Sequence, residues 1–136
     1  MIGAVMTCLI LGDSIAVGTH QAKPGCVAYA KGGINSRQWL NTNVGKAPFR
    51  ANTVIISLGS NDHKYIRTEE ELNTIRLLTY ADRVYWILPA IKPDIQEIVK
   101  KVAAENGDTV LTMTRLQKDG VHPSWAGYKK LAEEIK

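Results

Sequence analysis

The stretch "CLILGDSIAVGT", residues 8–19, begins as an apolar run and breaks at a glycine. Gly12 is followed directly by Asp13 and Ser14, after which the pattern becomes helical. A short apolar run bounded by a turn is typical of a buried strand. Serine is also a favoured residue at a helix start, and one interpretation is that the turn simply needs small polar residues. The alternative is that Ser14 is held at a strand end in order to react, and the rest of the sequence must decide.

Short apolar runs alternate with longer segments of helical period along the chain. The runs are apolar almost throughout, which is expected of strands whose sheet is covered on both faces. We predict five strands, at residues 7–12, 26–33, 52–59, 83–90 and 108–113.

Five segments between and after these runs have helical features. The two clearest starts resemble capping boxes, with Thr68 and Glu71 in one and Asp94 and Glu97 in the other. Gly107 is a favoured residue for a helix end. We predict helices at residues 14–22, 35–44, 68–79, 93–106 and from about 124 onwards.

This alternation predicts an α/β fold, a three-layer α/β/α sandwich around a five-stranded parallel sheet. Right-handed crossovers leave few topologies, and the flavodoxin-like strand order 2-1-3-4-5 is the natural one. The length of 136 residues suits one domain, 1–136.

The charge of the chain gives little indication of a macromolecular partner. The formal net charge is +4, and the lysine pairs at 100–101 and 129–130 fall on predicted helices. Solvated helix faces explain these pairs better than a nucleic-acid stripe does, so we expect no nucleic-acid partner.

The N-terminal stretch "MIGAVMTCLILGDS" resembles a signal peptide only superficially. It has no Lys or Arg before its apolar part. It is too short to span a membrane, so we interpret it as the first strand. A cytoplasmic location is the default expectation, and a mature or excised part of a secreted or phage protein remains the alternative.

Cys8 and Cys26 each lie in or beside an apolar run. The simpler expectation is that both are free thiols that behave as small buried hydrophobes. A disulfide stays open if the two runs are neighbouring strands. No second Cys or His lies at metal-ligand spacing, so we expect no metal.

Polar or glycine-rich clusters follow four of the five predicted strands. In parallel sheets of this kind, ligands and chemistry gather at the carboxyl ends of the strands. The clusters are Gly12–Ser14, Gly32–Asn35, Gly59–His63 and Asp119–His122.

These clusters complement one another chemically. A serine hydroxyl is a weak nucleophile without a base, and His122 is the candidate base for Ser14. Asp119 lies three residues earlier and can fix the tautomer of the imidazole. Three donors are available for an oxyanion, namely the backbone N–H groups of Ser14 and Gly33 and the side-chain amide of Asn61.

The same residues resemble a known family. "GDS" at 12–14, a glycine at 33, "GSND" at 59–62 and "DGVHP" at 119–123 are similar, in order and spacing, to the four blocks of the SGNH hydrolases, also called the GDSL esterase/lipase family. Ile15 stands where the family's fourth residue is leucine.

The resemblance implies a flavodoxin-like sandwich and a role for each matching residue. Ser14 would be the nucleophile and first oxyanion donor, Gly33 and Asn61 the other donors, His122 the general base and Asp119 its orienting partner. It implies no cofactor and no metal. Asp13 and Asp62 are better interpreted as braces of their loops.

We therefore expect a serine esterase, acting on a small ester or an acetylated carbohydrate. The connections between elements are short and leave no room for a lid, which favours short acyl groups such as acetyl. The alternatives are a lysophospholipase or thioesterase, a catalytically silent binding module on the same fold, and a flavin-binding protein, for which "GDSIAVGT" is a poor phosphate loop. The residues expected to line the pocket are Ile15, Ile34, Asn35, His63, Tyr65 and Val121.

Overall fold

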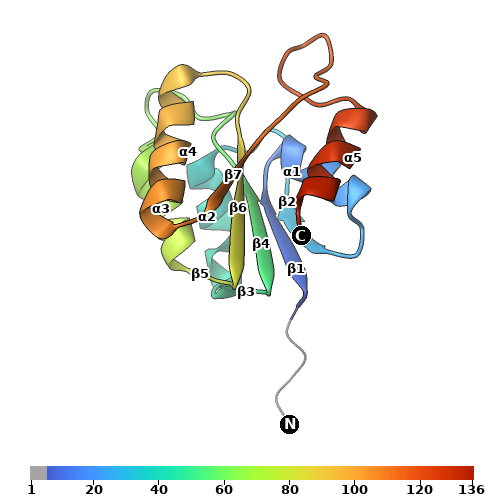
Figure 1. Cartoon of the computed structure of the whole chain (residues 1–136). Helices are drawn as coiled ribbons and strands as arrows, with labels where there is room; N and C mark the ends of the chain where they lie inside the picture. Colours follow the sequence, from blue (N-terminus) through green and yellow to red (C-terminus); the bar gives the residue numbers. More distant parts are fainter. Residues whose placement is uncertain (1–5) are drawn as a thin grey trace.

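A five-stranded parallel sheet forms the centre of the structure, a computed structural model that describes residues 6–136 (Figure 1). Its strand order is β2-β1-β4-β6-β7, which is the predicted order 2-1-3-4-5 when the strands of this sheet are counted alone. Two short strands, β3 and β5, form a separate parallel pair that the sequence did not predict, because each is only two residues long. The strands are β1 (Cys8–Gly12), β2 (Val27–Ala30), β3 (Phe49–Arg50), β4 (Thr53–Ser57), β5 (Thr79–Tyr80), β6 (Arg83–Leu88) and β7 (Thr109–Thr112).

Helices cover both faces of the central sheet, which confirms the three-layer sandwich. Helices α1 and α5 lie on one side, and α2, α3 and α4 lie on the other (Figure 1). The helices are α1 (Ser14–Ala22), α2 (Ser36–Asn43), α3 (Thr68–Leu77), α4 (Pro93–Asn106) and α5 (Trp125–Glu134), and a 3-10 turn (Val44–Lys46) follows α2.

The core lies on both faces of the sheet because the strands are apolar at nearly every position. Successive side chains of a strand point to opposite faces. Ile10 and Ile55 therefore pack toward α1 and α5, while Leu9, Val54 and Trp86 pack toward α2, α3 and α4. All five side chains are buried.

The helix ends agree with the sequence pattern at one place and differ at two. Gly107 ends α4 in a left-handed conformation, as predicted. Neither predicted capping box forms: the residues before α3 and α4 make no side-chain capping bond. The hydroxyl of Thr68 instead donates to Asp62, 2.8 Å away. A tertiary contact thus replaces the local one.

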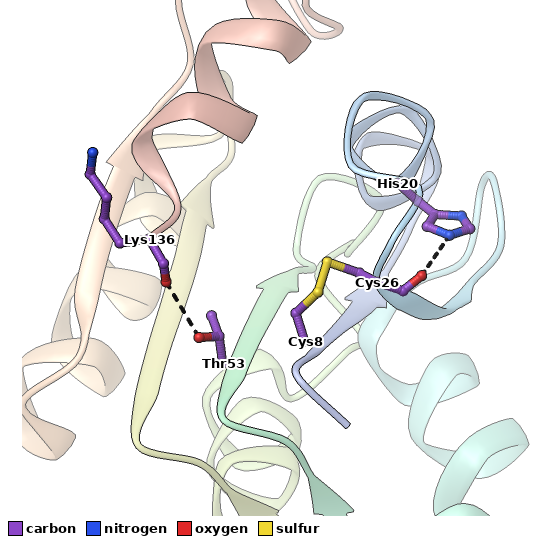
Figure 2. The surroundings of a disulfide bond; sticks show 5 residues. All are labelled: Cys8, His20, Cys26, Thr53 and Lys136. Carbon is purple, nitrogen blue, oxygen red and sulfur yellow. Dashed lines mark hydrogen bonds between the residues drawn. A yellow bond between two sulfur atoms is a disulfide. The ribbon is translucent and has the colours of Figure 1, made fainter. Parts of the chain in front are cut away.

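Cys8 and Cys26 form a disulfide bond, so the expectation of free thiols was wrong (Figure 2). The strand register explains the pairing. Leu9 lies opposite Val27 in the parallel pair β1 and β2. The residues that precede these two, Cys8 and Cys26, therefore lie side by side. Their Cα atoms are 4.8 Å apart. The N-terminal apolar stretch was predicted to be the first strand, and β1 does begin at Cys8. Residues 1–5 of that stretch lie outside the part of the chain that the structure describes.

Within residues 6–136, no helix has the length and apolar character needed to cross a bilayer. The same residues contain no group of three His, Cys, Asp or Glu side chains arranged to hold a metal ion.

Candidate active site

The four predicted clusters lie at one end of the central sheet. They follow β1, β2, β4 and β7, whose carboxyl ends point the same way because the strands are parallel. The segment between β7 and α5 rises at that end of the molecule (Figure 1). Side chains from distant parts of the chain can therefore meet there.

Ser14 is the first residue of α1, but it is not the residue that caps the helix. That residue is Asp13, whose carboxylate accepts a hydrogen bond from the backbone N–H of Ile15 at 3.0 Å. The serine hydroxyl is thereby free for another partner. Its Oγ lies 2.7 Å from Nε2 of His122, across 108 residues of sequence.

Gly12 explains why the strand ends on a glycine before this serine. Its φ of +148° is one that side-chain-bearing residues rarely adopt, and an added Cβ would lie 1.9 Å from the carbonyl oxygen of Ser57. Strands β1 and β4 therefore approach at this point more closely than any other residue permits.

His122 and Asp119 lie on the same short loop. A bridge between Leu116 and Pro123 closes that loop at its base. His122 Nδ1 lies 2.7 Å from Asp119 Oδ2. Asp119 Oδ1 also accepts bonds from the backbone N–H groups of Val121 and His122, at 2.9 and 3.0 Å.

These hydrogen bonds stabilise the ionised form of Asp119. The backbone N–H of His122, followed by that of Val121 and by the imidazole, lowers the pKa of Asp119 to about 2. The carboxylate is therefore ionised at neutral pH and can hold the proton of the imidazole on Nδ1. Nε2 then keeps a lone pair directed at the hydroxyl of Ser14, the arrangement that a general base requires.

The loops after β2 and β4 meet beside Ser14. Gly33 has a φ of +78°, and a Cβ added at Gly32 would lie 3.8 Å from the Cβ of Ser14. The side-chain amide of Asn61 donates to the carbonyl oxygen of Ile34 at 3.0 Å. This bond uses one of the two N–H groups of the amide, and it ties the two predicted donor loops together.

Asp62 and Lys92 hold the loop that contains Asn61. The buried Asp62 carboxylate accepts from the backbone N–H of Ser36 and from the hydroxyl of Thr68, each at 2.8 Å. The bracing role expected for it agrees with these bonds. Lys92 was missed by sequence reasoning, and its ammonium donates to the carbonyl oxygens of Ser60 and Asp62 at 2.7 and 2.8 Å. The sequence offered one weak indication of this role: Lys92 follows the end of β6, and parallel strands end at the same edge of the sheet.

Asp13 is fully buried and directly precedes Ser14. Burial raises its pKa to about 6, against the opposing effect of the hydrogen bonds from Ile15 and Ser57. Its Oδ2 atom has no hydrogen-bond partner among the described residues.

Three of the six residues predicted to line the pocket have buried side chains. Ile15, Ile34 and Asn35 are 1%, 6% and 8% exposed. Both isoleucines belong to the core, and the Asn35 side chain caps α2 by accepting from Gln38 N–H at 2.9 Å. Ile15 lies in the first turn of α1, and Ile34 and Asn35 directly precede α2.

The other three predicted pocket residues lie at the surface. His63 and Tyr65 are exposed next to Asn61, and the backbone N–H of Tyr65 donates to His63 Nδ1 at 3.3 Å. Val121 is half-buried in the loop of His122.

In sequence, neither a family model nor a curated protein matches this chain. In structure, the chain is similar to a GDSL-like lipase from Bacteroides thetaiotaomicron, with a TM-score of 0.70, 19% identity and coverage of 98% of this chain and 88% of that one. It is also similar to the C-terminal catalytic domain of peptidoglycan O-acetyltransferase A from Streptococcus pneumoniae, with a TM-score of 0.59, 18% identity and coverage of 98% of both chains. Phospholipase A1 from Streptomyces albidoflavus matches with a TM-score of 0.64, 14% identity and coverage of 98% of this chain and 100% of that one. Strand order, helix layers and these similarities agree, and the chain has the fold of the SGNH (GDSL) hydrolases.

Proposed function

We propose that this protein is a serine esterase that hydrolyses short acyl esters through an acyl-enzyme. The observation that carries the proposal is the chain of contacts from Ser14 Oγ to His122 Nε2 and from His122 Nδ1 to Asp119, with both distances at 2.7 Å. Nucleophile, base and orienting acid within hydrogen-bond reach of one another are the geometric signature of a triad.

In the first half of the reaction, Ser14 Oγ attacks the carbonyl carbon of the ester as His122 Nε2 takes its proton. Asp119 stabilises the imidazolium that forms, and it stays ionised throughout. The tetrahedral intermediate collapses when its bond to the alcohol oxygen breaks. His122 gives its proton to that oxygen, and the alcohol leaves.

In the second half, His122 takes a proton from water, and the resulting hydroxide equivalent attacks the acyl carbon. The bond to Ser14 Oγ then breaks, and Oγ recovers its proton from the imidazolium. The products are one carboxylic acid and one alcohol, with the enzyme regenerated.

The developing oxyanion needs donors aimed at its position. Those proposed are the backbone N–H groups of Ser14 and Gly33 and the second N–H of the Asn61 amide. The bond from Asn61 to Ile34 and the proximity of Gly32 to Ser14 support their convergence. Losing one such donor typically lowers kcat by about 100- to 1000-fold.

We propose acetylated carbohydrate as the substrate class. His63 and Tyr65, which lie next to Asn61, are exposed, and this suits a bulky alcohol that stays outside the site. The structural similarity to a peptidoglycan O-acetyltransferase supports the same class. Disulfides persist in oxidising surroundings, so the bond between Cys8 and Cys26 supports an extracellular carbohydrate.

A lipid hydrolase is the second candidate, and one observation favours it. A largely apolar hollow of about 450 Å³ lies beside the Asn61 loop, with Ile66, Pro93, Ile95 and Ile98 in its lining. The similarity to phospholipase A1 agrees with that candidate. A longer acyl chain would occupy this hollow.

The test measures hydrolysis of p-nitrophenyl acetate, butyrate and octanoate by the parent protein, Ser14→Ala and Thr74→Ala. Thr74 is the matched control, because its hydroxyl lies on the exposed surface of α3. We expect the parent and the control to hydrolyse the acetate ester and Ser14→Ala to lose the activity. Parent activity no higher than that of Ser14→Ala contradicts the esterase proposal and favours a silent binding module.

The acyl-length series and a polymer assay then identify the substrate class. We expect kcat/KM to fall from acetate to octanoate, and we expect acetate to be released from an acetylated polysaccharide. A preference for octanoate contradicts the short-acyl proposal and favours the lipid hydrolase.

A further inference from the structure

Lys92 stands out among the lysines because it reaches the functional end of the sheet from an element that carries none of the four clusters. It follows β6 and directly precedes α4. Its ammonium donates to two backbone carbonyl oxygens, those of Ser60 and Asp62, at 2.7 and 2.8 Å. These two carbonyls flank Asn61 on either side.

The ammonium of Lys92 has no carboxylate partner among residues 6–136, unlike the lysines that pair with glutamates on α3 and α4. The carboxylate of Asp62 is occupied by Ser36 and Thr68. The half-buried ammonium of Lys92 therefore holds two neutral carbonyl oxygens of the Asn61 loop.

The backbone of Lys92 is also unusual. Its φ of +65° lies in the left-handed region, where a non-glycine residue is uncommon. It occupies the position before α4 without capping that helix by its side chain. Strain of this kind is typically retained at functional sites.

The loop that Lys92 contacts depends on outside support. Gly59 has a φ of +115°, and the turn from Gly59 to Asp62 is closed by one backbone bond of 3.0 Å. Asp62 ties this loop to α2 and α3, and Lys92 ties it to the start of α4. The position of the Asn61 amide is therefore fixed from both sides.

We propose that Lys92 is a positioning residue, which holds Asn61 in place as an oxyanion donor. This inference rests on the proposed esterase function and adds a residue to it. Lys92 acts on the transition state through Asn61, because its bonds are to the backbone on either side of that residue. Its removal lowers kcat and leaves the binding of the ground-state ester nearly unchanged.

The kinetic test is a double-mutant cycle with Lys92→Met, Asn61→Ala and the combined variant. Lys100→Met is the control, since Lys100 is exposed on α4 and its ammonium pairs with Glu97 on the same helix. We expect Lys92→Met to lower kcat roughly tenfold or more, with KM changed by less than about twofold. We expect the combined variant to be no slower than Asn61→Ala, because residues that act through one another are not additive. Multiplicative losses, or an effect confined to KM, overturn the proposal.

A second measurement does not depend on activity. In protein labelled with ¹⁵N at asparagine, the side-chain amide signals of Asn61 are identified by their loss in Asn61→Ala. We expect them to shift or broaden in Lys92→Met and to stay in place in Lys100→Met. Unchanged Asn61 signals in folded Lys92→Met overturn the positioning role, whereas an inactive parent with shifted signals overturns only the esterase. Should the methionine variant not fold, Lys92→Gln replaces it, because its amide is too short to reach both carbonyls, and the expectations are the same.

Discussion

Asp13 makes the stability of this protein depend on pH in a direction opposite to that of most carboxylates. Its pKa is raised from 3.8 to about 6 because the side chain is buried, and its Oδ2 atom has no hydrogen-bond partner within residues 6–136. The folded state therefore holds a proton on Asp13 over a pH range in which the unfolded chain has released it. Stability is highest below pH 4 as far as this group is concerned, and it is lost as the pH rises through about 6.

The size of the effect follows from the shift. A difference of about two pKa units corresponds to about 3 kcal/mol, and most of this change falls between pH 4 and 7. Asp13→Asn removes the titration but keeps a side-chain oxygen to accept from Ile15. The amide leaves a buried donor unpaired at a cost of about 1–3 kcal/mol, which does not change with pH.

The assay is urea unfolding of the parent, Asp13→Asn and Asp82→Asn at intervals from pH 4 to 7.5. Asp82 is the control because it is exposed in a turn. We expect the free energy of unfolding of Asp13→Asn, relative to the parent, to rise by about 2–3 kcal/mol across this range. If the difference in the free energy of unfolding between Asp13→Asn and the parent does not change with pH, the inference that burial raises the pKa of Asp13 is refuted.

Two further variants test other parts of the structure. Asp119→Asn places an amide against the imidazole, and we expect kcat for p-nitrophenyl acetate to fall about 10- to 100-fold with an unchanged KM. This loss is smaller than the loss expected for a buried triad acid, because the Asp119 side chain is 46% exposed and water can partly replace its carboxylate. An unchanged kcat contradicts the proposal that Asp119 orients the imidazole of His122. Replacing Cys8 and Cys26 by alanine opens a loop of 18 residues, and we expect a loss of about 3 kcal/mol in urea unfolding, matched by the parent in reductant. Equal stabilities contradict a disulfide in the folded protein.

Much of the fold could be predicted because hydrophobic period and strand ends are local properties. The central strands are apolar on both faces, which indicated a covered parallel sheet, and the clusters at their ends indicated one functional edge. Features that depend on register or tertiary competition could not be predicted in this way. The pairing of Cys8 with Cys26 requires the offset of β1 against β2, which no single run of sequence contains.

Side-chain direction at the site was also beyond the sequence pattern. Ile15 follows Ser14 directly, yet the first turn of α1 directs it into the core. Lys92 lies about 30 residues from the loop that it holds, and no pattern within its own segment indicates that contact. Motifs identified which residues gather, whereas packing decided which of them face outward.

The loop that carries both Asp119 and His122 has a consequence for how this fold could change over time. It is closed at its base by the bridge between Leu116 and Pro123, and it contributes no strand to the central sheet. A single short deletion inside it would remove both His122 and Asp119 in one event, while the layers beneath kept their packing. Under the proposed mechanism, the exchange of this one segment would add or remove catalysis, and Ser14 would stay in place at the start of α1.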